Sequence, residues 1–183
     1  MSSRSAVPPE MALMKTIEES ALSDLLADVT ESLLVDQLLK EGPLRDIPIV
    51  SSLMNLAKAG VDIANYLFLK KIVRFLHHLR DISVEERLRF GDRLHEDEEF
   101  RQRVGENLFL LLHRLDDMQK PDLLGRIFRA FVVGEIDYDL YQKLSTAVDR
   151  IRVSSIPYLI EFYADQPSPE SSDDETLQSL AFC

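Results

Sequence analysis

The chain has 183 residues, enough for a domain with a hydrophobic core, and 45% of them are apolar, which excludes a fully disordered protein. Its 32 acidic and 21 basic side chains give a net charge of −11, so most of the surface would repel the phosphates of a nucleic acid. The one cysteine, Cys183, excludes an internal disulfide and favours a reducing cytoplasm. No apolar segment of the signal-peptide type follows Arg4.

Helical periodicity dominates the chain, and no segment shows sustained period-two alternation. The sequence therefore predicts an all-α fold, a single-domain bundle of six or seven helices. Residues 1–9 are expected to be a flexible lead and residues 10–164 the helical domain. The acidic segment 165–183, rich in proline and serine, is predicted to be disordered. The first helix is predicted over 10–40, and Glu41-Gly42-Pro43 ends it.

The second helix is predicted to begin near Pro48 and to run to about Leu79, as the long central hydrophobic helix of the bundle. Its polar residues recur at spacings of three and four, which places them on one helix face. These residues are Asn55, Lys58, Asp62 and Asn65. The opposite face is apolar, so we expect the other helices of the protein to cover it.

A membrane role for this segment is the alternative. A charged residue at the centre of a spanning helix costs roughly 2.5–3.5 kcal/mol, so Lys58 and Asp62 argue against a single span surrounded by lipid. An effector that inserts the amphipathic 47–79 helix remains open. The stretch 48–80 is basic, with five cationic groups and one acidic group. Three of the cationic groups are the candidate surface for a partner or for anionic headgroups: Lys70, Lys71 and Arg74.

Local signals mark the remaining helices. Ser83-Val-Glu-Glu86 is a capping box that predicts a helix over about 84–95, and a further helix is expected over about 98–115.

Towards the C-terminus, Pro121 opens a helix that Gly134 ends. Asp137 is the predicted N-cap of the next helix, and a last short helix is expected over 157–163.

The histidines do not predict a metal site. Adjacent His77 and His78 point to different sides of a helix, and neither pairs with His95 or His113 at a ligand spacing. No metal and no cofactor is therefore expected.

A cluster of carboxylates, Asp116, Asp117 and Asp122, could in principle support acid–base chemistry. Its place between two helices favours helix capping instead, because an acid in a first turn meets the positive end of the helix dipole. An enzyme that uses these three groups is the least favoured class, and no catalytic residue is predicted.

Two segments resemble a group of uncharacterised bacterial proteins of similar size. They are KAGVDIANYLFLKKIVRFLHHL (58–79) and LDDMQKPDLLGRIFRAFVVGEIDYDLYQKLSTAVDRI (115–151), joined by ISVEERLRF. The group carries a K-A-G…Y-L-F-x-K-K…F-L block followed by an L-L-G-x-I-F-x-A block. These motifs consist mostly of packing residues, so the resemblance implies an all-α fold and supplies no activity that can be assigned to named residues.

The sequence as a whole predicts a non-enzymatic helical interaction or regulatory protein that acts through helix surfaces. A protein partner is expected and a nucleic acid is not. The expected location is the cytoplasm, with peripheral attachment to a membrane as the alternative.

Overall fold

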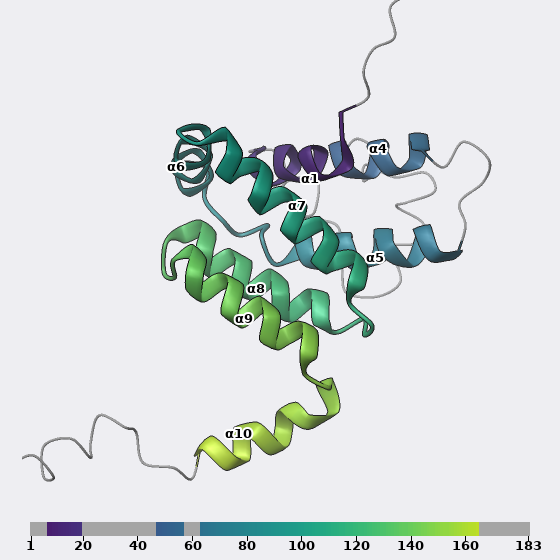
Figure 1. Ribbon diagram of the computed structural model, residues 1–183, viewed down its shortest axis with the longest axis vertical. Helices are drawn as coiled ribbons and strands as arrows, with labels where there is room; N and C mark the ends of the chain where they lie inside the picture. The colour runs from purple at the N-terminus through teal and green to yellow at the C-terminus, as the bar shows by residue number, and fades with distance from the viewer. Residues whose placement is uncertain (1–6, 20–46, 57–62, 165–183) are drawn as a thin grey trace, which may run out of the picture. The chain divides into compact units, whose positions relative to one another are not determined.

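The computed structural model describes residues 7–19, 47–56 and 63–164. Within these residues the chain forms eight α-helices, one short 3-10 helix and no strand, so the predicted all-α fold is confirmed (Figure 1). The chain divides into two compact units, Met1–Arg150 and Ile151–Cys183. The helical domain predicted over 10–164 crosses this boundary, and each unit is described by itself.

The described part of the first unit holds seven of the α-helices, which carry the labels of Figure 1. They are α1 (Pro9–Glu18), α4 (Pro48–Leu56), α5 (Ile63–His77), α6 (Val84–His95), α7 (Glu98–Arg114), α8 (Lys120–Val133) and α9 (Tyr138–Arg150).

Three predicted helix boundaries are confirmed by their hydrogen bonds or backbone angles. At the start of α6, the Glu86 N–H donates to Ser83 Oγ at 3.2 Å and the Ser83 N–H donates to the Glu86 carboxylate at 2.9 Å, which completes the capping box. At the start of α9, Asp137 accepts from the Leu140 N–H at 2.8 Å. Gly134 ends α8 with a φ of 85°, in the left-handed region.

The predicted central helix over 48–79 is wrong as a single element, because two helices, α4 and α5, occupy its described parts. Residues of α4 and α5 approach within 8 Å at Cα. A straight helix would hold even the nearest pair, Leu56 and Ile63, about 10 Å apart. The chain therefore changes direction between them. Gly60, which the pattern marked as a candidate kink, lies outside the described residues.

The helix predicted over 10–40 also ends earlier than expected. It ends at Glu18, and Glu19 is extended, with φ −69° and ψ 131°. The Ile17 carbonyl accepts from Arg87 Nη1 at 2.8 Å, and in a longer helix this carbonyl would accept from the backbone four residues on. The Arg87 guanidinium thus supplies the hydrogen bond that the next helical turn would otherwise donate to this carbonyl. The rest of the predicted helix lies outside the described residues.

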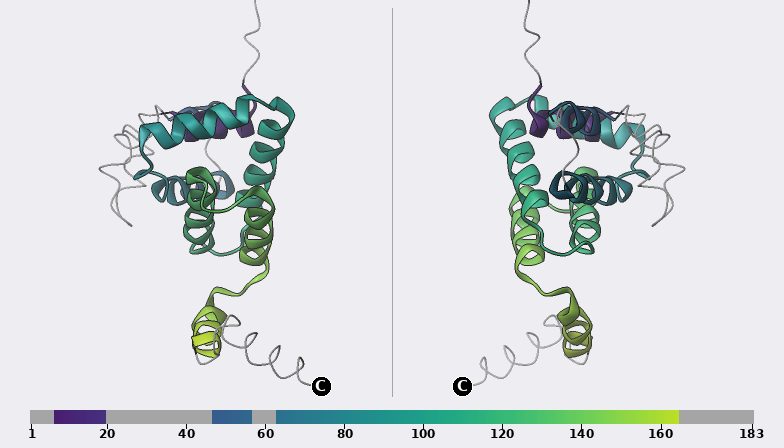
Figure 2. Two further views of the ribbon diagram at one scale, coloured as in Figure 1. Left: turned by 90° about the vertical axis from the view of Figure 1, so that its left-hand side faces the viewer. Right: turned by 90° about the vertical axis from the view of Figure 1, so that its right-hand side faces the viewer.

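The core of the first unit lies where these helices cross. Helix α1 packs on α4 and α7, α5 packs on α8, and α8 packs on α9 (Figures 1 and 2). Helices α8 and α9 lie side by side and run in opposite directions, as their short connection requires. Helices α1 and α4 to α8 contribute almost fully buried apolar side chains, and α9 adds Tyr141 and Val148. The almost fully buried ones include Leu13, Ile17, Ile49, Val50, Ile72, Phe75, Leu76, Phe90, Leu94, Val104, Leu108, Leu112, Leu124 and Phe128.

Aromatic rings form the centre of the packing around α8. The ring of Phe128 makes edge contacts with Phe75 of α5, Phe90 of α6 and Tyr141 of α9, with centroids 5.4 to 6.0 Å apart. Such pairs contribute about 0.5–1.5 kcal/mol each beyond burial. Phe128 therefore links three neighbouring helices to α8.

A buried arginine joins the ends of two helices. Arg87 of α6 is 2% exposed, and its guanidinium donates to the carbonyls of Ile17, at the end of α1, and of Leu79, in the turn after α5. Helix C-termini carry a partial negative charge, which compensates a buried cation. Burial lowers the pKa of Arg87, and the charge of Glu86 opposes this shift. Arg87 thus acts as a tie between α1, α5 and α6.

The second unit contains the 3-10 helix Val153–Ser155 and α10 (Ile156–Ala164), which matches the short helix predicted over 157–163. The large apolar side chains Tyr158, Leu159, Ile160 and Phe162 of α10 are exposed, with Tyr158 at 73% and Ile160 at 66%. In the part of the chain that the structure describes, every helix is too short or too polar to cross a membrane.

Candidate functional site: an arginine-lined surface

The polar stripe predicted on the central helix is divided by the structure. Asn65 lies exposed near the start of α5. Asn55 belongs to α4, and nothing is described of its side chain, while Lys58 and Asp62 lie outside the described residues. Because α4 and α5 are separate helices, Asn55 and Asn65 do not share one helix face.

All three basic residues predicted as a partner surface make contacts with other described residues of the chain. Lys71 Nζ donates to the carbonyls of His113, at 3.3 Å, and of Leu115, so it caps the end of α7. Burial lowers the pKa of Lys71, partly opposed by Asp116. Lys70 lies 5.1 Å from the centre of the Tyr66 ring. The partner surface at these residues stays a prediction, but the Lys71 ammonium group is already bound to carbonyls at the end of α7.

Arg74, the third residue, pairs with Asp122 at the start of α8. Its Nε donates to Asp122 Oδ2 at 3.1 Å, its Nη2 donates to the same carboxylate, and His78 Nε2 lies 3.2 Å from Oδ1. Burial raises the pKa of Asp122, but the hydrogen bonds from His78 and Arg74 outweigh it, and the pKa lies below its usual value. This cluster ties the C-terminal half of α5 to α8.

We expect Asp122→Asn to lower the free energy of unfolding by about 2 kcal/mol at pH 7, because it removes a charged acceptor of two side chains. The folded pKa lies below the unfolded value of about 3.9, so this stabilisation is present above about pH 4 and is lost as the pH falls through the folded pKa. Urea unfolding of both proteins at pH 7 and pH 3 measures the difference. A difference that is the same at both values would contradict the account.

The other carboxylates of the predicted cluster have separate partners. Asp116 pairs with Lys120 at 2.6 Å, and Asp117 accepts from the Gln119 N–H at 2.7 Å. These contacts shape the turn before α8, whose N-cap residue Gln119 makes no side-chain capping bond, while Asp122 lies in the first turn of α8 as predicted. Among the described residues there is no group of three or more side chains that could hold a metal ion.

A basic pocket, here called the α5–α8 pocket, lies between the turn after α5 and one side of α8. Its volume is about 350 Å³. The lining residues are His77, His78, Arg80, Asp81, Arg126 and Arg129. Arg126 and Arg129 are three residues apart on α8, which places them on one helix face. With both histidines neutral, the lining side chains carry a net charge of +2.

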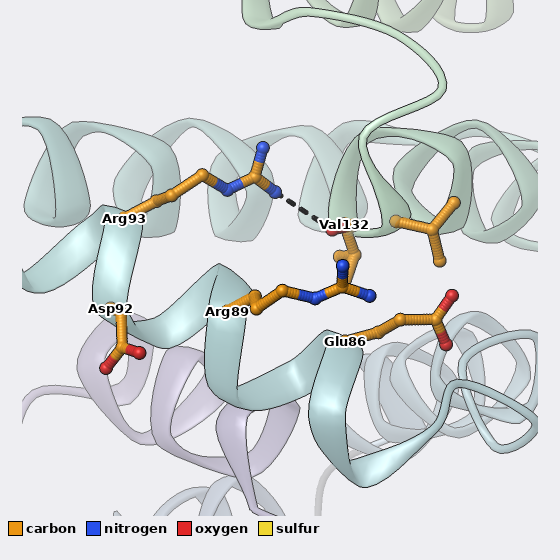
Figure 3. Close-up of a pocket in the computed structure, with 6 residues that line it drawn as sticks. Glu86, Arg89, Asp92, Arg93 and Val132 are labelled. Atoms are coloured by element: carbon orange, nitrogen blue, oxygen red, sulfur yellow. Dashed lines mark hydrogen bonds between the residues drawn. The ribbon is translucent and has the colours of Figure 1, made fainter.

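A second pocket, the α6–α8 pocket, lies where α6 meets the C-terminal end of α8 (Figure 3). Its volume is about 310 Å³, and it is lined by Glu86, Arg89, Asp92, Arg93, Val132 and Val133. Arg93 Nη2 donates to the Val132 carbonyl at 2.9 Å and so caps α8, while Arg89 extends beside Glu86. Two carboxylates balance the two arginines of this pocket.

Helix α8 contributes to both pockets, with Arg129 in the first and Val132 and Val133 in the second. Hydrogen bonds from Ser83 lower the pKa of Glu86, and the charges of Arg89 and Arg129 lower it further. The charges of one arginine from each pocket therefore act on the Glu86 carboxylate. We call the combined surface the arginine face, defined by Arg80, Arg89, Arg93, Arg126 and Arg129.

Sequence reasoning missed this surface. A partial signal is present, because Arg89 and Arg93 are four residues apart and Arg126 and Arg129 are three apart, so each pair shares a helix face. The pairing of α6 with α8 depends on contacts distant in sequence, which no local pattern encodes.

No protein-family model, curated protein or solved structure matches the chain. The assignment of a site therefore depends on the geometry and charge described above, and the resemblance to the bacterial group stays a prediction.

Proposed function

We propose that the protein is a non-enzymatic interaction module that binds an acidic segment of a partner protein through the arginine face. The observation that carries the proposal is that five arginines, from the turn after α5 and from α6 and α8, line two pockets that share helix α8. This occurs in a chain whose net charge is −11.

The arginine side chain suits such a role. Its guanidinium presents several donors in a planar fork and binds carboxylates in a bidentate manner. Arg89 and Arg126 are exposed, so a partner can reach them. Arg93 is less suited to this contact, because its guanidinium already caps α8.

The charge around the face favours a short acidic segment over a long polyanion. Outside residues 48–80, each of the segments 1–47, 81–164 and 165–183 carries more acidic than basic groups. A nucleic acid that extended beyond the two pockets would meet this acidic surface and be repelled. A peptide of a few carboxylates would contact the arginines alone.

The test is a titration of the full chain with a fluorescein-labelled decaglutamate peptide at low and high salt. We expect binding that weakens with salt, because exposed charge pairs are screened. The double variant Arg89→Glu/Arg126→Glu should lower the affinity roughly tenfold or more, since two attractive pairs become repulsive.

A matched control carries the same change of charge elsewhere. Arg103 on α7 and Arg150 on α9 are exposed and line neither pocket. The double variant Arg103→Glu/Arg150→Glu should bind the peptide almost as the wild type does. An equal loss in both double variants would show that only net charge matters, and it would refute the proposed site.

A further inference from the structure

We infer that the α5–α8 pocket binds a phosphomonoester, the phosphorylated side chain of a residue within the partner's acidic segment. The inference rests on the proposed function and adds the chemistry of the group that enters the pocket. The pocket is lined by three guanidinium groups, two imidazoles and one carboxylate, Asp81, which accepts from Arg80 Nε at 3.4 Å.

The charge of the pocket matches a dianion. The lining carries +2 with neutral histidines. A phosphomonoester carries about −1.5 to −2 at pH 7 and offers three acceptor oxygens, whereas a carboxylate carries −1 and offers two. A carboxylate has two oxygens and matches a single guanidinium fork, whereas the three oxygens of a phosphate can accept from several guanidinium groups at once.

The histidines are held in place by other side chains. Asp122 is ionised, because its pKa is lowered, so it accepts the Nε2 proton of His78 and fixes this ring. Arg74 in turn holds Asp122 from α5. Arg80 contacts the ring nitrogens of His77, 3.1 Å from Nδ1. His77, His78 and Arg80 are therefore already positioned, which reduces the entropy lost on binding.

A close helix crossing brings the two sides of the pocket together. A Cβ atom added to Gly125 would lie 2.8 Å from the Phe75 carbonyl oxygen and 2.9 Å from His78 Cβ. Only glycine permits this approach of α8 to the end of α5. The next residues on α8, Arg126 and Arg129, thereby come to line one pocket with His77 and His78.

The neighbouring α6–α8 pocket lacks this chemistry. Its two arginines face two carboxylates, Glu86 and Asp92, so its net charge is zero. Arg93 also donates to the Phe131 and Val132 carbonyls. This pocket can contact single carboxylates, but it does not match a dianion. It supplies an internal control within the same surface.

The experiment compares two synthetic decapeptides of aspartate and serine that differ by one central phosphoserine. We expect the full chain to bind the phosphopeptide about tenfold more tightly. The double variant Arg126→Lys/Arg129→Lys keeps both charges but loses both planar forks. It should lose the gain from the phosphate, so that the variant binds the two peptides with similar affinity, whereas Arg89→Lys in the α6–α8 pocket should retain the gain.

The outcomes separate this inference from the proposed function. Equal binding of both peptides by the wild type overturns the phosphate pocket and leaves the acidic-segment site standing. Binding of neither peptide overturns both. If Arg89→Lys loses the phosphate gain as fully as Arg126→Lys/Arg129→Lys does, the phosphate does not bind specifically in the α5–α8 pocket. That result also overturns the inference. The protein could instead bind vesicles that contain phosphoinositides and show no gain from phosphoserine. The ligand of the pocket would then be a lipid headgroup, and this result also overturns the inference.

Discussion

Replacing Arg87 with methionine is expected to lower the free energy of unfolding by about 2–4 kcal/mol, although methionine fills similar space. The variant leaves the buried carbonyls of Ile17 and Leu79 without the guanidinium donors that they have in the wild type. An unsatisfied buried acceptor costs about 1–3 kcal/mol. Burying the charge of Arg87 is itself costly, and methionine removes this cost. The expected loss is therefore placed as low as about 2 kcal/mol at its lower end. Urea unfolding followed by circular dichroism gives the value.

The control for this change is Arg89→Met, two residues later on the same helix. Arg89 is exposed, so its replacement should change the free energy of unfolding by less than about 0.5 kcal/mol. Arg87→Lys should fall between the two, because an ammonium group keeps the charge but lacks the fork that reaches both carbonyls. Similar effects of Arg87→Met and Arg89→Met would contradict the role of Arg87 as a tie between α1, α5 and α6.

Gly125→Val should lower the free energy of unfolding by about 2–3 kcal/mol. The added Cβ would meet the Phe75 carbonyl at 2.8 Å and His78 Cβ at 2.9 Å, so α5 and α8 must separate. This effect opposes and exceeds the gain of less than about 1 kcal/mol that valine has over glycine in a helix interior. Thermal and urea unfolding both measure it.

Gly91 on α6 provides the matched control, since a Cβ added there meets no atom within 4 Å. Gly91→Ala should therefore raise the free energy of unfolding by about 0.5–1 kcal/mol, from the higher helix propensity of alanine. Opposite signs at the two glycines are the expected result. Stabilisation at both positions would show that the α5–α8 crossing is looser than described.

Local signals in the sequence were sufficient for most helix boundaries. The capping box at Ser83, the N-cap at Asp137 and the left-handed Gly134 each act through hydrogen bonds or backbone angles within a few residues. The all-α fold followed from periodicity alone. These features are predictable because their physical causes lie next to them in the chain.

Features that depend on distant contacts were missed. The segment 48–79 is apolar over much of its length, so its pattern did not reveal that it forms two helices. The end of α1 at Glu18 depends on Arg87, about seventy residues away. Arg87 itself occupies the apolar face of α6 with Phe90, Gly91 and Leu94, at helical spacing, and this position was the signal that it is buried.

The candidate site shows the same division. The basic stretch at Lys70, Lys71 and Arg74 is visible in the sequence, but in the structure Lys71 caps α7 and Arg74 pairs with Asp122. The arginine face is spread over three elements, and its arginines become neighbours only when α5 and α6 pack against α8.

The central claim, that an acidic segment binds at the arginine face, is tested most directly by NMR titration. The side-chain Nε–H signals of the arginines are recorded while decaglutamate is added to the full chain at low salt. The account predicts shifts of Arg89 and of Arg126 or Arg129, with Arg103 and Arg150 unchanged. Shifts confined to Arg103 or Arg150, or no shift of any arginine at a saturating peptide concentration, would contradict it.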